Sequence, residues 1–450
     1  MNPKTPRFHF MRWLYPGLGV KRWLLVALAG ALLFADGAYR WFLAEGMQFA
    51  LNETIDNFFD DFMPIPRLMW IFMGAGLVLV VLGFQKWMSA VIGALTPQRK
   101  DIVDALYDMR LQRGYKITAI GGGTGLATLL RGLKQYTSNL TAVVTVTDDG
   151  GSSGRLQKEL GILPPGDIRN CLVALADDEA MVTDLFRYRF TEGDGLIGHS
   201  FGNLFLAAMT GITGNFDRAI KESSRVLNIK GRVLPSTLAH ARLGAQLEDD
   251  TVILGETNIS QTGKPIKRLF LDPPQADPLP EVIAAIREAD AIVLGPGSLY
   301  TSILPNLLVR GIAHEIAAAT CAKIYVCNVM TQPGETDAFT ASRHVRALLD
   351  HAGERVCEYA VVNEQQPHRL LEAYAQEKQI PVQADADAIE ALGLRVVGAN
   401  VINETETVRH DSKRLAEVLI KLIDEYVAHR ASFMKLKIGT PRESTSVSGA

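Results

Sequence analysis

The sequence predicts an α/β protein with a doubly wound, Rossmann-like parallel sheet and a small antiparallel insert, preceded by an N-terminal two-helix transmembrane hairpin. Three observations carry this prediction. Two long apolar segments lie near the start of the chain, β-rich runs alternate with helical patterns from residue 116 onward, and a glycine cluster follows the first β-rich run. Such alternation indicates parallel strands joined by helices that cover both faces of the sheet.

The apolar segments cover residues 23–44 and 67–84, and each approaches the length needed to cross about 30 Å of hydrocarbon. Asp36 and Arg40 lie near the end of the first segment, where their spacing on a helix lets them pair. We expect a membrane hairpin over residues 23–84. A cleaved signal peptide and a pair of buried soluble helices are the alternatives, and the lack of a small-residue cleavage site disfavours the first.

The charges around this hairpin predict its orientation. Basic residues flank its two outer ends, at Lys4, Arg7, Arg12, Lys21, Arg22, Lys86, Arg99 and Lys100. The charged residues of the connection are all acidic: Glu45, Glu53, Asp56, Asp60 and Asp61. By the positive-inside rule, we expect a multi-pass protein of the cytoplasmic (inner) membrane with both termini in the cytoplasm.

The remaining boundaries follow from changes in pattern. We expect a cytoplasmic N-terminus at residues 1–22 and a linker at 85–115. An α/β domain at 116–430 and a disordered tail at 431–450, where apolar periodicity ends, complete the chain.

Composition limits the classes of partner. The chain of 450 residues has a formal net charge of −3 and no long basic run, so we expect no nucleic-acid partner. Four cysteines without CxxC spacing predict reduced, buried thiols rather than disulfides or a zinc site.

The expected parallel strands are short, apolar and rich in β-branched residues. They are Lys116–Ile120, Thr141–Thr147, Ala291–Leu294, Lys323–Cys327, Tyr359–Val362 and Leu394–Val401. Helices are expected at Gly125–Gln135, Pro280–Ala289, Gly311–Ala319 and Asp337–Ala352. The insert is predicted as an antiparallel meander of Ala239–Leu247, Thr251–Leu254 and Ile266–Leu271, because turn signals separate these three runs.

The glycine cluster lies at the first strand-to-helix turn, where a doubly wound fold presents helix amides to an anion. Gly122, Gly123, Thr124 and Gly125 follow Gly121, so the spacing differs from G-x-G-x-x-G and lacks the Lys-Ser/Thr of a P-loop. The pattern favours phosphate binding, with a plain tight turn as the alternative.

A second cluster, Thr147–Arg155, follows the next strand and contains Asp148 and Asp149 among glycines and serines. At the carboxyl edge of a parallel sheet, two carboxylates can hold Mg²⁺ against phosphates or accept a proton. A solvated capping loop is the alternative. We favour the functional interpretation, because adjacent first and second strands bring this loop beside the glycine cluster.

Further loops repeat this pattern of small residues with a few polar groups. Pro164–Asn170 offers Asp167 as an N-cap and Arg169 as a phosphate ligand. Gly198–Asn203 contains His199, which is more often structural than catalytic in such a position.

The loop after the third predicted strand, Gly295–Ser302, offers another strand-to-helix anion site. Its backbone amides around Gly297 and the hydroxyls of Ser298 and Thr301 are available to a phosphate. Asn328–Thr336 follows the next strand, so several such loops converge on one sheet edge.

Taken in order, these loops resemble the YvcK/CofD family, most closely its YvcK branch of gluconeogenesis factors. The resemblance covers about Lys116 to Glu425. Its motifs are GGGTGL at Gly121–Leu126, TDDGGSSGRL at Thr147–Leu156, PPGDIRN at Pro164–Asn170, GHSFGNL at Gly198–Leu204, GPGSLYTSILPNLLV at Gly295–Val309 and NVMTQPGET at Asn328–Thr336.

The resemblance implies two possible activities and leaves open whether the protein is an enzyme. CofD-type members are 2-phospho-L-lactate transferases, in which a hydroxyl displaces a nucleoside monophosphate from an activated diphosphate with Mg²⁺. YvcK-type members resemble binders of UDP-sugars, such as UDP-N-acetylglucosamine or UDP-glucose, that support cell shape and wall synthesis during gluconeogenic growth.

The resemblance also implies roles for individual residues. The glycine cluster would lie along the nucleotide, and Asp148 and Asp149 would hold a metal or orient a hydroxyl. Asp167 and Arg169 would help to hold nucleotide or sugar. Asn203, Ser298 and the loop of Thr331 would close the pocket.

We therefore expect a membrane-anchored, UDP-sugar-binding regulator of envelope synthesis and gluconeogenic growth, because an anchor holds the domain near wall-precursor enzymes. Envelope synthesis proteins and further copies of the chain are its expected partners. A CofD-like phosphotransferase is the alternative, and a transporter-linked sensor using Asp36 and Arg40 is a weaker third.

Overall fold

The structure is a computed structural model that describes residues 20–44, 68–95, 102–177, 179–405 and 407–438. The chain divides into two compact units, Met1–Arg110 and Leu111–Ala450.

In the first unit, helices α1 (Val20–Ala44) and α3 (Leu68–Leu95) pack against each other in antiparallel fashion. Glycines allow the close approach: a Cβ on Gly76 would lie 2.5 Å from the backbone nitrogen of Phe34, and one on Gly83 would lie 2.6 Å from that of Ala27. Small residues at helix contacts are typical of membrane hairpins.

The predicted pairing of Asp36 with Arg40 is confirmed, with Nε and Oδ2 3.1 Å apart. By length and composition, segments Arg22–Phe42 and Trp70–Ala90 are long and apolar enough to cross a membrane. The membrane span and its orientation stay predictions. The acidic connection lies outside the described residues.

The region expected as a linker is largely helical where it is described. Helix α3 continues past residue 84 to Leu95, and α4 covers Ile102–Gln112. At the other end of the chain, α18 (Ser412–Ile438) continues through residues 431–438, so the prediction of a tail from residue 431 is wrong for that part. Residues 439–450 lie outside the described residues.

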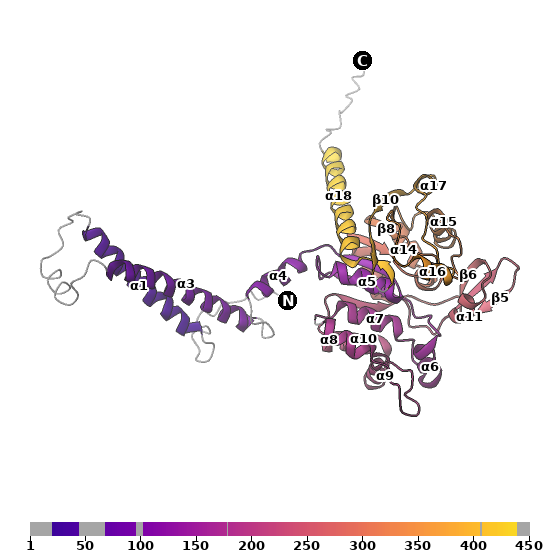
Figure 1. Cartoon of the computed structure of the whole chain (residues 1–450), viewed down its shortest axis with the longest axis horizontal. Helices are drawn as coiled ribbons and strands as arrows, with labels where there is room; N and C mark the ends of the chain where they lie inside the picture. The colour runs from indigo at the N-terminus through magenta and orange to yellow at the C-terminus, as the bar shows by residue number, and fades with distance from the viewer. Residues whose placement is uncertain (1–19, 45–67, 96–101, 178, 406, 439–450) are drawn as a thin grey trace, which may run out of the picture. The chain divides into compact units, whose positions relative to one another are not determined.

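The second unit is built on a parallel sheet of seven strands in the order β10-β9-β8-β7-β1-β2-β3 (Figure 1). The strands are β1 (Ile117–Gly121), β2 (Leu140–Val144), β3 (Arg232–Pro235), β7 (Ala291–Leu294), β8 (Ala322–Val326), β9 (Tyr359–Asn363) and β10 (Arg395–Ala399). The predicted doubly wound fold is confirmed. The chain leaves the adjacent strands β1 and β7 in opposite directions, so ligands are expected at their carboxyl ends.

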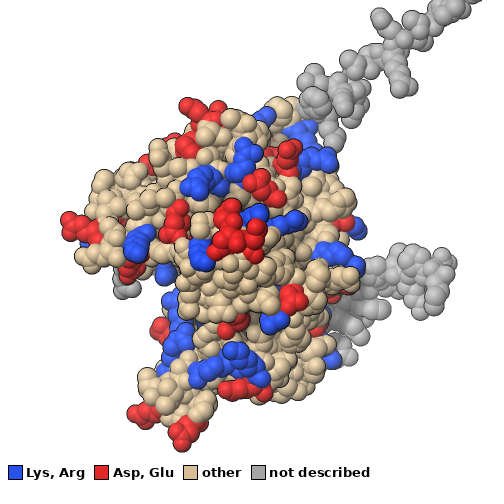
Figure 2. Space-filling view, turned by 90° about the vertical axis from the view of Figure 1, so that its right-hand side faces the viewer, with Lys and Arg blue, Asp and Glu red and all other residues tan. Residues whose placement is uncertain are grey.

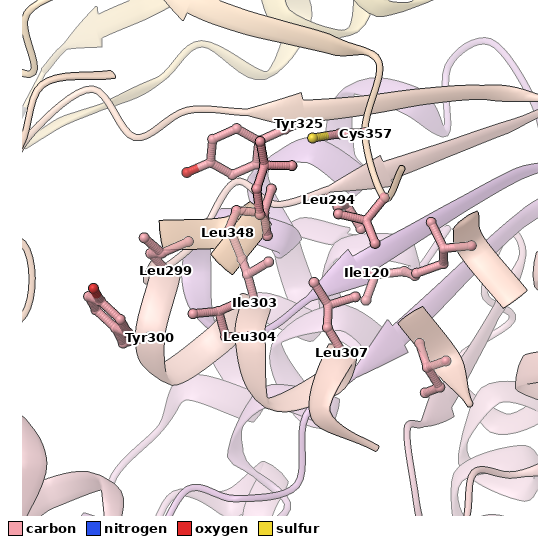
Figure 3. Packing of buried hydrophobic residues seen from close by; sticks show 14 of the residues in the cluster. Ile120, Leu294, Leu299, Tyr300, Ile303, Leu304, Leu307, Tyr325, Leu348 and Cys357 are labelled. Atoms are coloured by element: carbon pink, nitrogen blue, oxygen red, sulfur yellow. The ribbon is translucent and has the colours of Figure 1, made fainter. Parts of the chain in front are cut away.

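Helices cover both faces of this sheet. For that reason every residue of β1 and of its neighbours β2 and β7 is buried. Ile117 and Ala119 pack with α5 (Gly123–Leu133), α7 (Gly166–Leu175), α10 (Phe216–Val226) and α18. Ile120 packs on the opposite face, with α12 (Pro280–Glu288), α13 (Leu304–Leu308), α14 (Ile312–Ala318) and α15 (Ala341–Ala352). Figure 3 shows part of this second cluster.

The insert forms an antiparallel sheet as predicted, but in the order β5-β4-β6 rather than as a meander. Its strands are β4 (Arg242–Leu247), β5 (Val252–Leu254) and β6 (Ile266–Asp272). Helix α11 (Glu256–Gln261) follows β5, and the chain after it returns to pair β6 with β4. The four cysteines are free and buried, as expected.

Shorter elements complete the unit. They are α6 (Gly151–Leu160), α8 (Glu179–Arg187), α9 (Phe201–Thr213), the π-helical turn η2 (Leu299–Ile303), α16 (Leu371–Gln376), α17 (Ala386–Glu390) and the hairpin of β11 (Ile402–Glu404) and β12 (Val408–His410).

Candidate functional site

A cavity of about 430 Å³ is formed by the loops that follow β1, β2, β7 and β8. Its position matches the switch point between β1 and β7. Ten residues named from the sequence line it: Gly122, Gly123, Thr124, Gly125, Asp148, Asp167, Gly297, Ser298, Thr301 and Thr331. The convergence of four sequence-distant loops on one sheet edge is thereby observed.

The glycine cluster is both a tight turn and an amide-lined wall. Gly123 begins α5 with φ of +65°, and a Cβ on Gly125 would lie 2.6 Å from the carbonyl oxygen of Pro296 in the β7 loop. Gly122, the N-cap residue of α5, has no side chain with which to cap the helix. The backbone amides of Thr124 and Gly125 in the first turn are therefore available to an anion in the cavity.

Two aspartates lie beside this wall. The carboxylate of Asp167 accepts a hydrogen bond from the backbone N–H of Gly123, and a Cβ on Gly122 would lie 2.5 Å from its Oδ2. Burial, and then the nearby charge of Asp148, raise the pKa of Asp167 to about 6. Asp148 accepts from the Gly150 N–H at 2.9 Å, and burial also raises its pKa.

Glu256, at the start of α11, adds a third carboxylate that sequence reasoning missed. Its Oε2 is buried without a hydrogen-bond partner, and burial followed by the charge of Asp148 raises its pKa well above the ordinary value. A buried carboxylate without a partner is costly, so a bound cation or proton would stabilise it.

These oxygen ligands fit the chemistry of Mg²⁺, which commonly takes one or two carboxylates and completes its shell with water and substrate phosphates. Across the described part of the chain, no three His, Cys, Asp or Glu residues are arranged as a complete metal cage. These carboxylates therefore suit a Mg²⁺ ion whose remaining ligands would be water and the phosphate oxygens of a bound ligand.

The predicted hydroxyl ligands are mostly engaged by the protein itself. Ser298 Oγ accepts from Gln332 Nε2 at 2.6 Å, and Thr301 Oγ1 donates to Glu335 at 3.3 Å. Thr331 Oγ1 accepts from the N–H of Ile380 at 3.0 Å. These side chains shape the wall, whereas the backbone amides remain for a ligand.

Asp149 was predicted to share the metal, but the structure does not bring it to the cavity wall. Its Oδ1 accepts hydrogen bonds from the backbone N–H of Thr257 at 3.0 Å and from Thr257 Oγ1 at 2.7 Å. This carboxylate is therefore held at the start of α11 and positions that helix.

Arg169 and Asn203 also lie outside the lining, in a polar network behind it. Arg169 donates to Ser200 Oγ at 2.7 Å and to Asn203 Oδ1 at 3.0 Å. Asn203 Nδ2 donates to Ser152 Oγ at 3.1 Å, and Ser152 lies 2.9 Å from His199 Nδ1. Their short, polar contacts indicate a structural role in fixing α6, α7 and α9.

The C-terminal hairpin supplies part of the wall that sequence reasoning missed. Arg409 and His410 of β12 line the cavity, as do Tyr374 and Gln379. Arg409 is the one Lys or Arg among the described residues of the lining, and it is exposed. No glycine-rich motif surrounds it, so its short strand gave no signal of its own.

His410 is buried, and its Nε2 donates to the carbonyl oxygen of Cys327 at 3.1 Å. Burial lowers its pKa to about 4, so the ring is neutral at neutral pH. This contact attaches β12 to the end of β8 and holds Arg409 at the cavity.

Comparison with known proteins identifies the family. The model of the family described as 2-phospho-L-lactate transferase CofD matches residues 117–402. A protein of Bacillus subtilis named gluconeogenesis factor is 52% identical over 312 residues, covering 69% of this chain and 98% of that protein. The chain belongs to the gluconeogenesis factor branch of the CofD family.

Other gluconeogenesis factors extend the match over both units. A Nostoc protein named putative gluconeogenesis factor is 47% identical over 428 residues, covering 92% of each chain. A crystal structure of a Bacillus halodurans protein has a TM-score of 0.67 at 49% identity, covering 68% of this chain and all of that one.

Proposed function

We propose that the cavity binds a UDP-sugar, such as UDP-N-acetylglucosamine or UDP-glucose. The carrying observation is that the first-turn amides of Thr124 and Gly125 in α5 and the guanidinium of Arg409 line one cavity at the switch point of the sheet. Amides and one arginine suit a diphosphate, and a volume of about 430 Å³ is in the range of small-ligand sites. The choice of uridine and sugar rests on membership of the gluconeogenesis factor branch.

We further propose that this gluconeogenesis factor acts from the inner membrane as a regulator of cell shape, envelope synthesis and gluconeogenic growth. The support is the pair of apolar helices together with the family name of its relatives. The Nostoc match covers 92% of the chain and therefore includes residues of both units, whereas the Bacillus subtilis match covers 69% of the chain.

A CofD-like phosphotransferase is the second candidate, because three carboxylates with raised pKa values meet at the cavity. Asp148 and Asp167 would hold Mg²⁺, which would neutralise phosphate charge. Glu256 would then be placed to accept a proton from an attacking hydroxyl. Positioning and charge neutralisation supply most of the rate in such transfers, so no protein nucleophile is required.

Native mass spectrometry of the full chain in detergent separates these candidates. We expect a UDP-sugar to co-purify with the protein. If a guanine nucleotide co-purifies instead and the protein turns over a deazaflavin precursor, the result would favour the transferase and contradict the regulator. Envelope synthesis proteins are the expected partners in the membrane, and cross-linking in intact cells identifies them.

A further inference from the structure

A second cavity of about 410 Å³ borders the π-helical turn η2 from another side. The turn contributes Thr301 to the first cavity and Tyr300 to the second. Glu335 lines the second cavity while accepting the hydrogen bond of Thr301. The two cavities therefore share one turn, and a hydrogen bond joins Glu335 of the second cavity to Thr301 of the first. Such π-helical turns are frequent at functional sites.

One side of the second cavity is suited to an anion. Arg343 lies over the ring of Phe339 at 4.3 Å, and Arg346 follows it on α15. Neither arginine has a carboxylate partner among the residues that the structure describes. Two neighbouring guanidinium groups with spare donors match the geometry of a phosphate.

The lysines of the same cavity, unlike these arginines, are each paired with a carboxylate. Lys264 pairs with Asp249 at 2.6 Å, and Lys267 pairs with Asp250 at 2.8 Å. Acidic and basic side chains are interspersed on the face that carries this end of the insert (Figure 2). The anion site is thus confined to the arginine pair and is not part of a broad basic surface.

The rest of the cavity is suited to hydroxyl groups. The carboxylates of Glu248 and Asp350 line it, and neither carboxylate has a hydrogen-bond partner among the described residues. The Tyr300 side chain is only 3% exposed, and Figure 3 shows its hydroxyl pointing away from the apolar cluster. Carboxylates accept hydrogen bonds from ligand hydroxyls, so Glu248 and Asp350 are suited to bind the hydroxyl groups of a sugar.

We propose that this second cavity binds a phosphorylated sugar and that its occupation changes the affinity of the first cavity for its ligand. The phosphate binds Arg343 and Arg346, and the sugar hydroxyls bind Glu248, Asp350 and Tyr300. The contact between Glu335 and Thr301 carries the effect to the first cavity. The proposal that the second cavity binds a phosphorylated sugar does not depend on which ligand the first cavity binds. The proposed change in affinity does depend on it, because it rests on the proposed nucleotide site.

Isothermal titration calorimetry of the full chain in detergent tests this proposal, with glucose 6-phosphate, glucose and inorganic phosphate as probes. Glucose 6-phosphate should bind at least about tenfold more tightly than either fragment, because only it engages both halves of the cavity. Arg343→Gln and Arg346→Gln should each weaken its binding by about tenfold. Arg355→Gln, an exposed arginine outside the cavity, is the matched control and should leave binding unchanged.

Three results would overturn the second site: no binding of glucose 6-phosphate, equal binding of inorganic phosphate, or equal affinity of the two arginine variants and wild type. Arg409→Gln removes the cation of the first cavity, so loss of glucose 6-phosphate binding in that variant would show that the probe enters the first cavity instead. Saturation with glucose 6-phosphate should shift the affinity for UDP at least about twofold, which is a small coupling for two linked sites. An unchanged UDP affinity contradicts the coupling alone, and an absence of UDP binding contradicts the proposed nucleotide site.

Discussion

Gly125 both allows the tight turn after β1 and lines the cavity. It must be glycine because the loop after β7 occupies the space where a side chain would be. Gly125→Ala places a methyl group against backbone that cannot move cheaply, so we expect a loss of about 1 to 3 kcal/mol in unfolding free energy and weaker nucleotide binding. Urea unfolding and calorimetry measure both. Gly211→Ala is the matched control: Gly211 is exposed in α9 with nothing within 4 Å, and the change should stabilise by roughly 0.5 to 1 kcal/mol.

The adjacent aspartates provide a paired test of the metal assignment. Asp148→Asn should reduce the dependence of nucleotide affinity on Mg²⁺, because Asp148 lines the cavity. Asp149→Asn should leave that dependence intact and instead lower stability, by about 1 kcal/mol, because it weakens the contact with Thr257. Calorimetric titration with and without Mg²⁺ measures the first effect. Equal responses of the two variants would contradict our division of their roles.

We expect the stability of the protein to depend on pH through the raised pKa of Glu335. Burial raises its pKa to about 7 in the folded protein, above the ordinary value of 4.5. The folded state therefore binds this proton more tightly, and its contribution to unfolding free energy falls as pH rises from about 4.5 to about 7. The loss is of order 3 kcal/mol. In urea titrations, Glu335→Gln should be more stable than wild type at pH 8 and similar to it at pH 4; a steeper decline in the variant contradicts this.

At the scale of elements, the sequence predicted six of the seven parallel strands, because buried runs between helical patterns have few alternatives. It missed β3, whose four residues end in Pro235 at the edge of the sheet. A short edge strand has weak periodicity, and proline is tolerated there. The meander was wrong because turn signals specify connections but not which strands pair.

Loop motifs likewise revealed only part of the site. Glycine-rich loops directly after strands were recognised, since their conformational requirements are visible in composition. Glu256, Tyr374 and Arg409 were missed, because their positions depend on long-range packing of α11, α16 and β12. The roles expected for Arg169 and Asn203 came from the loop motif and from the family resemblance, and neither could anticipate the hydrogen bond between these two side chains.

The contact between α1 and α3 depends on glycine at one face of α3. Gly76→Val should separate the helices, because the backbone of Phe34 lies within 2.5 Å of a Cβ there. Spin labels at the exposed positions Leu32 and Leu77 report the separation in lipid nanodiscs. Gly74→Val is the control, with nothing within 4 Å of its Cβ. An unchanged distance distribution in Gly76→Val would contradict this packing.

At the scale of the whole molecule, the α/β unit contains the candidate cavity, and the helical unit is proposed to determine where the protein acts. A Bacillus subtilis relative matches 69% of this chain over 98% of its own length, and the family model matches residues 117–402, which lie within the second unit. Sequence alone indicated this division, because the two units differ in composition, but it contained no information on how either unit meets a partner.

Calorimetric titration of UDP-N-acetylglucosamine into the full chain and its Arg409→Gln variant tests the central claim most directly. We predict saturable binding by wild type and at least about tenfold weaker binding by the variant, since a charged contact to the diphosphate is lost. Arg225→Gln, which alters a surface arginine paired with Glu222, should bind like wild type. Absence of binding by wild type, or equal affinity of wild type and Arg409→Gln, would contradict the account.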